Sequence, residues 1–133
     1  LEGLVALEDR MVMVLDLPRF GWEAVVEHCT QVIVVSTCDA QAVAGLAVLT
    51  RALRTTGMST SLLVRRTGGS ALASASELAS WCGLPLFGIL PNERTMKSDL
   101  NRGLTPGDRS RGALARQAQV LAAALVAPAS VAS

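Results

Sequence analysis

The sequence predicts an α/β domain in which helices cover both faces of a mostly parallel sheet of about four strands. Two observations support this fold class. Half of the 133 residues are hydrophobic and only 17% are charged, so the chain can bury a substantial core. Short apolar runs, typical of strands buried on both faces, alternate with longer amphipathic segments. Because strands that alternate with helices form parallel sheets, we expect a three-layer αβα arrangement.

Four apolar runs are the predicted strands. The first ends in Asp16-Leu17-Pro18, the second is rich in β-branched residues, and the fourth is entered through Gly83 and left through Pro91. The runs cover residues 11–15, 32–35, 62–64 and 84–90.

Helices are predicted between the strands from capping and stop residues. Asp39 is suited to cap a long helix that ends near Gly57, and Ser70 to start another that ends at Gly83. Shorter or terminal helices are expected at 22–29, 95–102 and 108–125. The length fits a single domain over residues 1–127, followed by a disordered tail at 128–133.

Charge and composition exclude several classes of function. The 12 Lys and Arg residues nearly balance the 11 Asp and Glu residues, which argues against a nucleic-acid partner. With two Trp, two Phe and no Tyr, the chain is also unsuited to stacking on single-stranded bases. No apolar run reaches the roughly 20 residues of a membrane span, and we expect no transmembrane segment. The N-terminus has no signal-peptide pattern, so a cytoplasmic location is expected.

The cysteines and the single histidine do not suggest a metal or catalytic site. Cys29, Cys38 and Cys82 form no C-x-x-C pair, and His28 alone adds little to a zinc set. We expect reduced, mostly buried thiols. Because neighbouring residues on a helix point about 100° apart, His28 and Cys29 are poorly placed to act as a catalytic pair.

Candidate site residues follow the predicted strands, because ligands of open parallel sheets gather at the carboxyl ends of the strands. Asp16 is either a magnesium ligand acting through water or a turn residue before Pro18. Arg65 and Arg66 either grip an anion or solvate a strand end. The Thr67-Gly68-Gly69 segment does not match the G-x-x-x-x-G-K-[ST] phosphate loop.

Other polar and aromatic residues have simpler interpretations. We interpret Asp39 as a helix cap. The basic series from Arg94 to Arg116 alternates with acidic residues, which favours a solvated face. Trp22 and Trp81 are predicted to pack against the sheet.

Taken in order, these segments resemble the MinD/ParA-type ATPases that have a deviant Walker A loop. Residues 12–18 resemble the strand that carries their Walker-B-like aspartate, and 83–91 resemble their "lglpvlg.iP" segment. The resemblance extends over about residues 10–125 and covers the C-terminal half of the family domain only. Asp-Leu-Pro-Arg at 16–19 and Gly-Leu-Pro-Leu at 83–86 are most similar to the CpaE/TadZ-like and septum-site-determining (Ssd) branch. The other matching segments are 32–39 with 42–43, 62–66, and 101–106 before 113–115.

The resemblance implies site residues for a nucleotide. Asp16 would hold magnesium through water if the other half of the domain were present, and Arg65, Arg66, Pro91 and Asn92 would flank the base. ATP and magnesium are therefore expected in a full-length parent protein, whereas no cofactor and no catalytic residue is expected in this chain alone. The deviant Walker A loop is absent from the sequence, and Arg65 stands where the family has an adenine-reading asparagine.

Three functions remain open at this point. The first is the C-terminal part of a MinD/CpaE-like protein that places septum, pilus or secretion machinery and reaches the inner membrane through protein partners. The second is a non-enzymatic interaction module. The third is a flavodoxin- or receiver-like domain, which ranks last because the third strand ends in Arg65 and the only lysine is Lys97.

The resembled fold also predicts how the sheet assembles. Its phosphate-loop strand lies between the strands that correspond to 11–15 and 32–35. Since the sequence opens at Leu1 rather than Met, we expect a fragment of a longer protein that lacks this strand. The two flanking strands then either pair directly or leave an open edge through which the chain self-associates.

Overall fold

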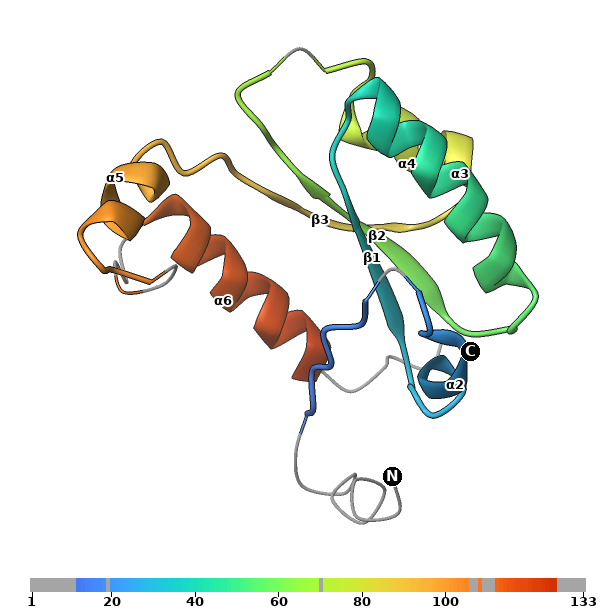
Figure 1. The fold of residues 1–133 in the computed structure, drawn as a ribbon. Helices are drawn as coiled ribbons and strands as arrows, with labels where there is room; N and C mark the ends of the chain where they lie inside the picture. Colours follow the sequence, from blue (N-terminus) through green and yellow to red (C-terminus); the bar gives the residue numbers. More distant parts are fainter. Residues whose placement is uncertain (1–11, 19, 70, 106–107, 109–111, 127–133) are drawn as a thin grey trace.

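The computed structural model describes residues 12–18, 20–69, 71–105, 108 and 112–126. It confirms the α/β class: a parallel sheet lies between helices (Figure 1). The tail expected at 128–133 lies outside the described residues. The elements are α2 (Glu23–Val26), β1 (Val32–Ser36), α3 (Ala40–Arg54), β2 (Thr60–Arg65), α4 (Ala75–Cys82), β3 (Leu86–Leu90), α5 (Met96–Asn101) and α6 (Ala113–Val126).

The described strands form one parallel sheet in the order β1-β2-β3. Val34 of β1 lies opposite Leu62 of β2. The register between β2 and β3 shifts by one residue: Leu62 pairs with Leu86, but the next residue, Leu63, pairs with Gly88. Phe87 is therefore the extra residue of a bulge in β3, and Gly88 follows it directly.

The strand predicted at 11–15 is wrong over its described residues, 12–15, so the sheet formed by the described residues has three strands where about four were expected. Residues 12–18 have no regular secondary structure, and the side chains of Val12 and Val14 are 50% and 77% exposed. The apolar run was read as a strand, but a strand is stable only when its backbone groups pair with a neighbour. Among the described residues β1 is an edge strand, and residues 12–15 do not pair with it.

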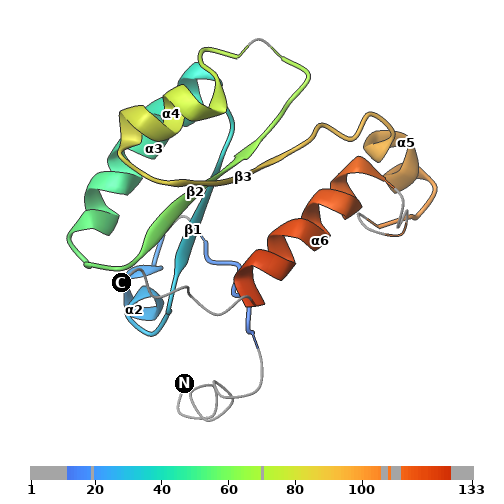
Figure 2. The same cartoon turned by 180° about the vertical axis from the view of Figure 1, so that it is seen from behind.

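Helices lie on both faces of the sheet. Figures 1 and 2 show α3 and α4 together on one face and α6 on the other. On the first face α3 contacts β1, while α4 contacts β3 and α3. The main core lies here, and Leu62 and Leu78 have no exposed surface. The buried core cluster consists of Trp22, Val26, Val34, Leu46, Leu53, Leu62, Val64, Leu78, Ala79 and Cys82.

The other face of the sheet is covered by α6 (Figure 1). α6 packs on β3, and Leu121 is the buried residue of this helix. A Cβ atom added to Gly88 would lie 2.5 Å from Leu121 Cδ2, so the absence of a side chain at Gly88 permits the contact. On the same side of the sheet, Val35 of β1 remains 58% exposed.

Capping residues define the ends of α3 and α4. The cap predicted at Asp39 is confirmed, because its carboxylate accepts a hydrogen bond from the Ala42 N–H at 3.0 Å. The predicted start of the next helix at Ser70 is wrong. α4 begins at Ala75, because Ser74 and Glu77 form a reciprocal capping box that fixes the first turn. Gly83 ends α4 in the left-handed conformation, as predicted.

The two tryptophans differ in their environment. Trp22, which precedes α2, is 8% exposed and belongs to the core, as predicted. Trp81 is 60% exposed, so the prediction that it packs against the sheet is wrong. In α4 the neighbouring Ala79 and Cys82 face the core, and the helical period directs residue 81 outward.

The Asp39 cap predicts a pH dependence of stability. Hydrogen bonds from the Thr37 hydroxyl and the Ala42 N–H hold the pKa of the Asp39 carboxyl below its ordinary value. A folded-state pKa below the unfolded value contributes stability at neutral pH that is lost as the pH falls through the folded value. We therefore expect the thermal midpoint to fall as the pH drops below about 4, the ordinary value for aspartate, and less steeply in Asp39→Asn, which keeps an acceptor but does not titrate. Equal slopes for the two proteins would contradict this assignment.

Candidate functional site

The loops after the three strands lie together at the carboxyl end of the sheet, as expected for parallel strands. Two backbone hydrogen bonds join them. The Arg66 N–H donates to Leu90 O at 2.8 Å, and the Leu72 N–H donates to Cys38 O at 2.7 Å. The segments that follow β1, β2 and β3 are therefore held side by side.

Arg65 and Arg66 extend from this edge toward opposite faces of the sheet, because successive strand residues alternate. By this alternation Arg65 is on the same face as Leu63, which lies near Gly88 on the α6 side of the sheet. Arg66 is on the same face as Leu62 and Val64, which belong to the core beneath α3 and α4. The sequence analysis treated the two arginines as one pair, whereas in the structure they lie on different faces of the sheet.

Arg65 lines a cavity of about 520 Å³ between the end of β2, the loop after β3 and α5. The cavity combines cationic, amide and apolar side chains. Its lining residues are Arg65, Asn92, Glu93, Arg94, Met96, Lys97, Leu100 and Asn101.

Pro91 and Asn92 follow β3 directly. Asn92 lines the cavity and is exposed, while Pro91, next to it, is partly buried. The loop after β2 also approaches this point, because a Cβ atom on Gly68 would lie 3.4 Å from Asn92 Nδ2. The structure thus brings Arg65 and Asn92 into one cavity and places Pro91 at its border.

Arg66 lies near the loop after β1. Burial raises the pKa of the Cys38 thiol, and the Asp39 carboxylate raises it further, while the Arg66 charge opposes both. A raised pKa keeps Cys38 protonated at neutral pH and makes it a weak nucleophile. Burial likewise raises the pKa of Cys82 despite the nearby charge of Arg54. Neither thiol is suited to nucleophilic catalysis.

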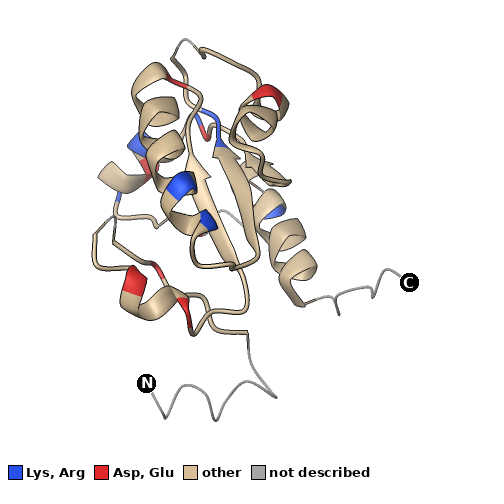
Figure 3. Ribbon diagram, turned by 90° about the vertical axis from the view of Figure 1, so that its right-hand side faces the viewer, with Lys and Arg blue, Asp and Glu red and all other residues tan. Residues whose placement is uncertain are grey.

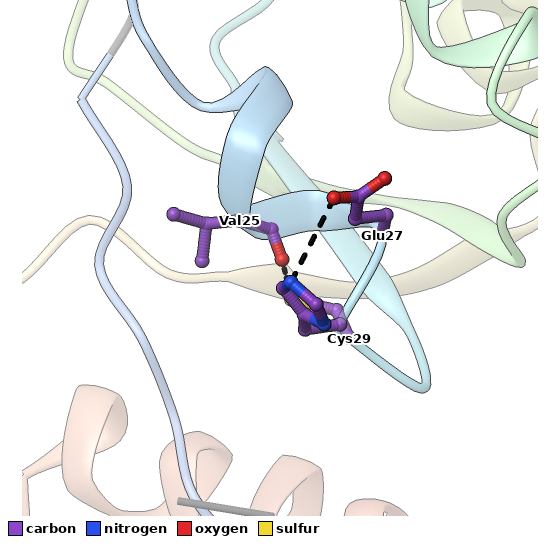
Figure 4. A network of polar contacts seen from close by, with 4 residues as sticks. Val25, Glu27 and Cys29 are labelled. Carbon is purple, nitrogen blue, oxygen red and sulfur yellow. Dashed lines mark hydrogen bonds and ion pairs between the residues drawn. The ribbon is translucent and has the colours of Figure 1, made fainter. Parts of the chain in front are cut away.

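The His28 and Cys29 side chains have separate partners at the end of α2 (Figure 4). The Cys29 thiol donates to Val25 O at 3.6 Å, and His28 Nε2 lies 3.7 Å from Glu27 Oε1. Each group thus interacts with its own local segment. Within the described residues, no three His, Cys, Asp or Glu side chains are grouped as metal ligands would be.

Asp16 is exposed in the segment 12–18 and does not line the cavity. Figures 1 and 2 place this segment on the α2 side of the molecule, away from α5. Of the five residues that the sequence analysis assigned to a nucleotide, Arg65, Asn92 and Pro91 therefore lie together, Arg66 lies on the other face of the sheet, and Asp16 lies apart.

Sequence reasoning did not assign the α5 side of the cavity. Arg94 and Lys97 were interpreted as part of a solvated basic face, Asn101 begins a segment that resembles the family, and Met96 and Leu100 lie in the predicted helix at 95–102, but none of the five was predicted to line a site. The available signal was their position, since all five follow β3 within 11 residues and ligands gather beyond such strand ends. In the view of Figure 3, basic positions are spread over several elements, and one group marks the end of β2.

Comparisons with known proteins show similarity of fold. No family model matches the sequence, and no curated protein matches it significantly. The structure is similar to that of the MinD cell division protein of Aquifex aeolicus, with a TM-score of 0.68 and 16% identity over 80% of this chain and 48% of that one. It is also similar to a ParA family ATPase from Chlorobium tepidum TLS, with a TM-score of 0.60 and 19% identity over 76% and 43% of the two chains.

These comparisons define the extent of the similarity. The chain spans less than half of the length of either solved structure. Its fold is that of MinD- and ParA-like ATPase domains, with a parallel sheet and flanking helices. Within the described ranges, no helix has both the length and the apolar character needed to cross a bilayer.

Proposed function

We propose that this chain is the C-terminal part of a MinD/CpaE-like protein that helps to place septum, pilus or secretion machinery, and that it acts through protein contacts. The observation that carries the proposal is the fold similarity to MinD over 80% of this chain but only 48% of that structure. The sequence segments at 16–19 and 83–86, which resemble the CpaE/TadZ-like and Ssd branch, support the finer assignment.

We assign ATP and magnesium to the full-length parent protein only. The resemblance places magnesium at Asp16 and the base near Arg65 and Asn92, and Asp16 is not among the residues that line the cavity, so the described part of this chain presents no complete nucleotide site. Arg65 also has only donor groups, whereas reading an adenine edge requires a donor and an acceptor. Asp16 is therefore proposed as a magnesium ligand through water in the parent, and no step of ATP chemistry is assigned to this chain.

A fluorescent fusion in the cells of origin tests the placement role. We expect the fusion to concentrate at the division site or at a cell pole, and its deletion to displace the septum or the pilus apparatus. A uniform distribution, with division and pilus assembly unchanged on deletion, would overturn the proposal. Fractionation of the same cells is expected to recover the protein with the inner membrane only while its protein partners are present.

The second candidate is a non-enzymatic interaction module of the same fold. Arg65 favours it, because this residue stands where the family has an adenine-reading asparagine and arginine offers no acceptor. In that case the full-length parent would also fail to bind ATP, whereas the first candidate requires that it does. A flavodoxin- or receiver-like role has no such support, since both solved structures reported above are of the MinD/ParA type.

The open edge of β1 predicts self-association of the isolated chain. Among the described strands β1 pairs only with β2, so its outer backbone groups have no strand partner, and the neighbouring Val35 is 58% exposed. Such an edge recruits another strand. We expect sedimentation to show a dimer that dissociates on dilution, with slow hydrogen exchange in β1.

Val35→Lys provides the matched variant for this prediction. A lysine on an exposed edge strand discourages pairing, and the exposed position tolerates the change. The variant is expected to remain folded and monomeric. A wild-type chain that is monomeric at every concentration, with the outer backbone groups of β1 unprotected, would show instead that the open edge is tolerated.

A further inference from the structure

We propose that the cavity beside α5 binds a small, multiply charged oxyanion, a ligand class distinct from the adenine base that the family resemblance would place near Arg65. The inference rests on the cavity's own residues and does not depend on the proposed placement role.

Three cationic side chains from three different segments converge on this cavity. Arg65 ends β2, Arg94 lies in the loop after β3, and Lys97 belongs to α5. The sheet and the loop hydrogen bond from Arg66 N–H to Leu90 O fix the first two segments relative to each other. Basic residues of an ordinary solvated face can lie anywhere on the surface, whereas here Arg65 and the later pair Arg94 and Lys97 line the same cavity.

The positive charge of the cavity is not neutralised by the part of the chain that the structure describes. No ion pair or hydrogen bond is recorded there for the side chains of Arg65, Arg94 or Lys97. Glu93 is the only carboxylate in the lining, so one negative charge stands against three positive charges; its Oε2 atom also accepts a hydrogen bond from the Leu114 N–H of α6 at 3.3 Å. The remaining positive charge around the cavity favours a bound anion.

The hydrogen-bonding capacity of these side chains selects oxyanions over a neutral base. Arginine and lysine only donate, and arginine donates in a fork that matches phosphate or carboxylate oxygens. The amides of Asn92 and Asn101 can add donors. Met96 and Leu100 provide an apolar wall, and Leu100 is 52% exposed, so a carbon framework between the charged groups would also find contact.

The cavity is open to solvent, and most of its lining side chains are exposed. Its volume of about 520 Å³ is sufficient for a small ligand. The position at the carboxyl ends of β2 and β3 is also where open parallel sheets bind ligands. Phosphate and carboxylate compounds share the required chemistry, and the experiment separates the two.

Isothermal titration calorimetry tests the proposal with pyrophosphate, citrate and adenosine as probes. We expect saturable binding of pyrophosphate or citrate, weakened by salt, and no binding of adenosine. Arg65→Ala and Lys97→Ala are each expected to weaken binding about tenfold. Arg51→Ala removes the same charge from the exposed end of α3, outside the cavity, and is expected to leave the affinity unchanged.

The outcomes separate the alternatives. Pyrophosphate alone would identify a phosphate ligand, and citrate alone a carboxylate ligand. Failure of both to bind, adenosine binding as tight as that of either anion, or an equal loss of affinity in Arg51→Ala would overturn the proposal. Circular dichroism of each variant checks that it is folded. Failure here would leave the placement role untouched, because that role is tested by cellular position.

Discussion

Replacing Leu62 with alanine is expected to destabilise the domain by about 2–5 kcal/mol, the range for large-to-small changes in a packed core. Leu62 has no exposed surface, and it lies in the central strand β2 within the cluster that α3 and α4 cover. Its loss would leave a cavity where the sheet meets both helices. Since domains of this size are stable by about 5–15 kcal/mol, the variant is expected to be strongly destabilised or unfolded. Urea denaturation measures the difference.

Two control variants make this prediction specific. Leu62→Met nearly conserves side-chain volume and is expected to cost less than about 1.5 kcal/mol. Val48→Ala changes a side chain that is 73% exposed on α3 and is expected to stay within about 0.5 kcal/mol of the wild type. A Leu62→Ala protein as stable as Val48→Ala would contradict the core described above.

Replacing Gly88 with alanine is expected to destabilise the packing of α6 by about 1–3 kcal/mol, as overpacking commonly does. The added Cβ would lie 2.5 Å from Leu121 Cδ2, so the helix or the leucine must move. Gly69→Ala is the matched control, because a Cβ there meets no atom within 4 Å.

A double-mutant cycle with Leu121→Ala isolates this contact. Leu121→Ala removes the Cδ2 atom, so Gly88→Ala is expected to cost little in that background. Additive effects of the two changes would show that Gly88 does not limit the approach of α6. Urea denaturation of the four proteins provides the free energies of unfolding.

Local signals in the sequence were sufficient for most of the fold. The apolar runs of β1, β2 and β3 and the cap at Asp39 act through neighbouring residues, so pattern and capping rules located them. The residues at 12–15 carry the same apolar signal, but pairing depends on a partner strand, which no local pattern supplies. The start of α4 was misplaced because Ser70 and Ser74 are equivalent by type, and only Ser74 has Glu77 three residues later.

The candidate site was predictable only in part. Placing ligand residues after the strands found Arg65, Pro91 and Asn92, because strand ends fix those positions along one edge. The opposite faces of Arg65 and Arg66 follow from the alternation of successive strand residues, which needs no knowledge of register. Arg94 and Lys97 follow β3 closely in the sequence, but that they share one cavity with Arg65 depends on the three-dimensional arrangement.

ATP turnover by the 133-residue chain is the most direct test of the central claim, that this chain has an ATPase-type fold without ATPase activity of its own. The measurement is phosphate release from ATP with magnesium, compared with a sample without protein. The account predicts no difference, because phosphoryl transfer depends on positioning and charge stabilisation by a phosphate loop, and the G-x-x-x-x-G-K-[ST] pattern does not occur in the sequence. Turnover above that background, abolished in Asp16→Ala, would contradict the account.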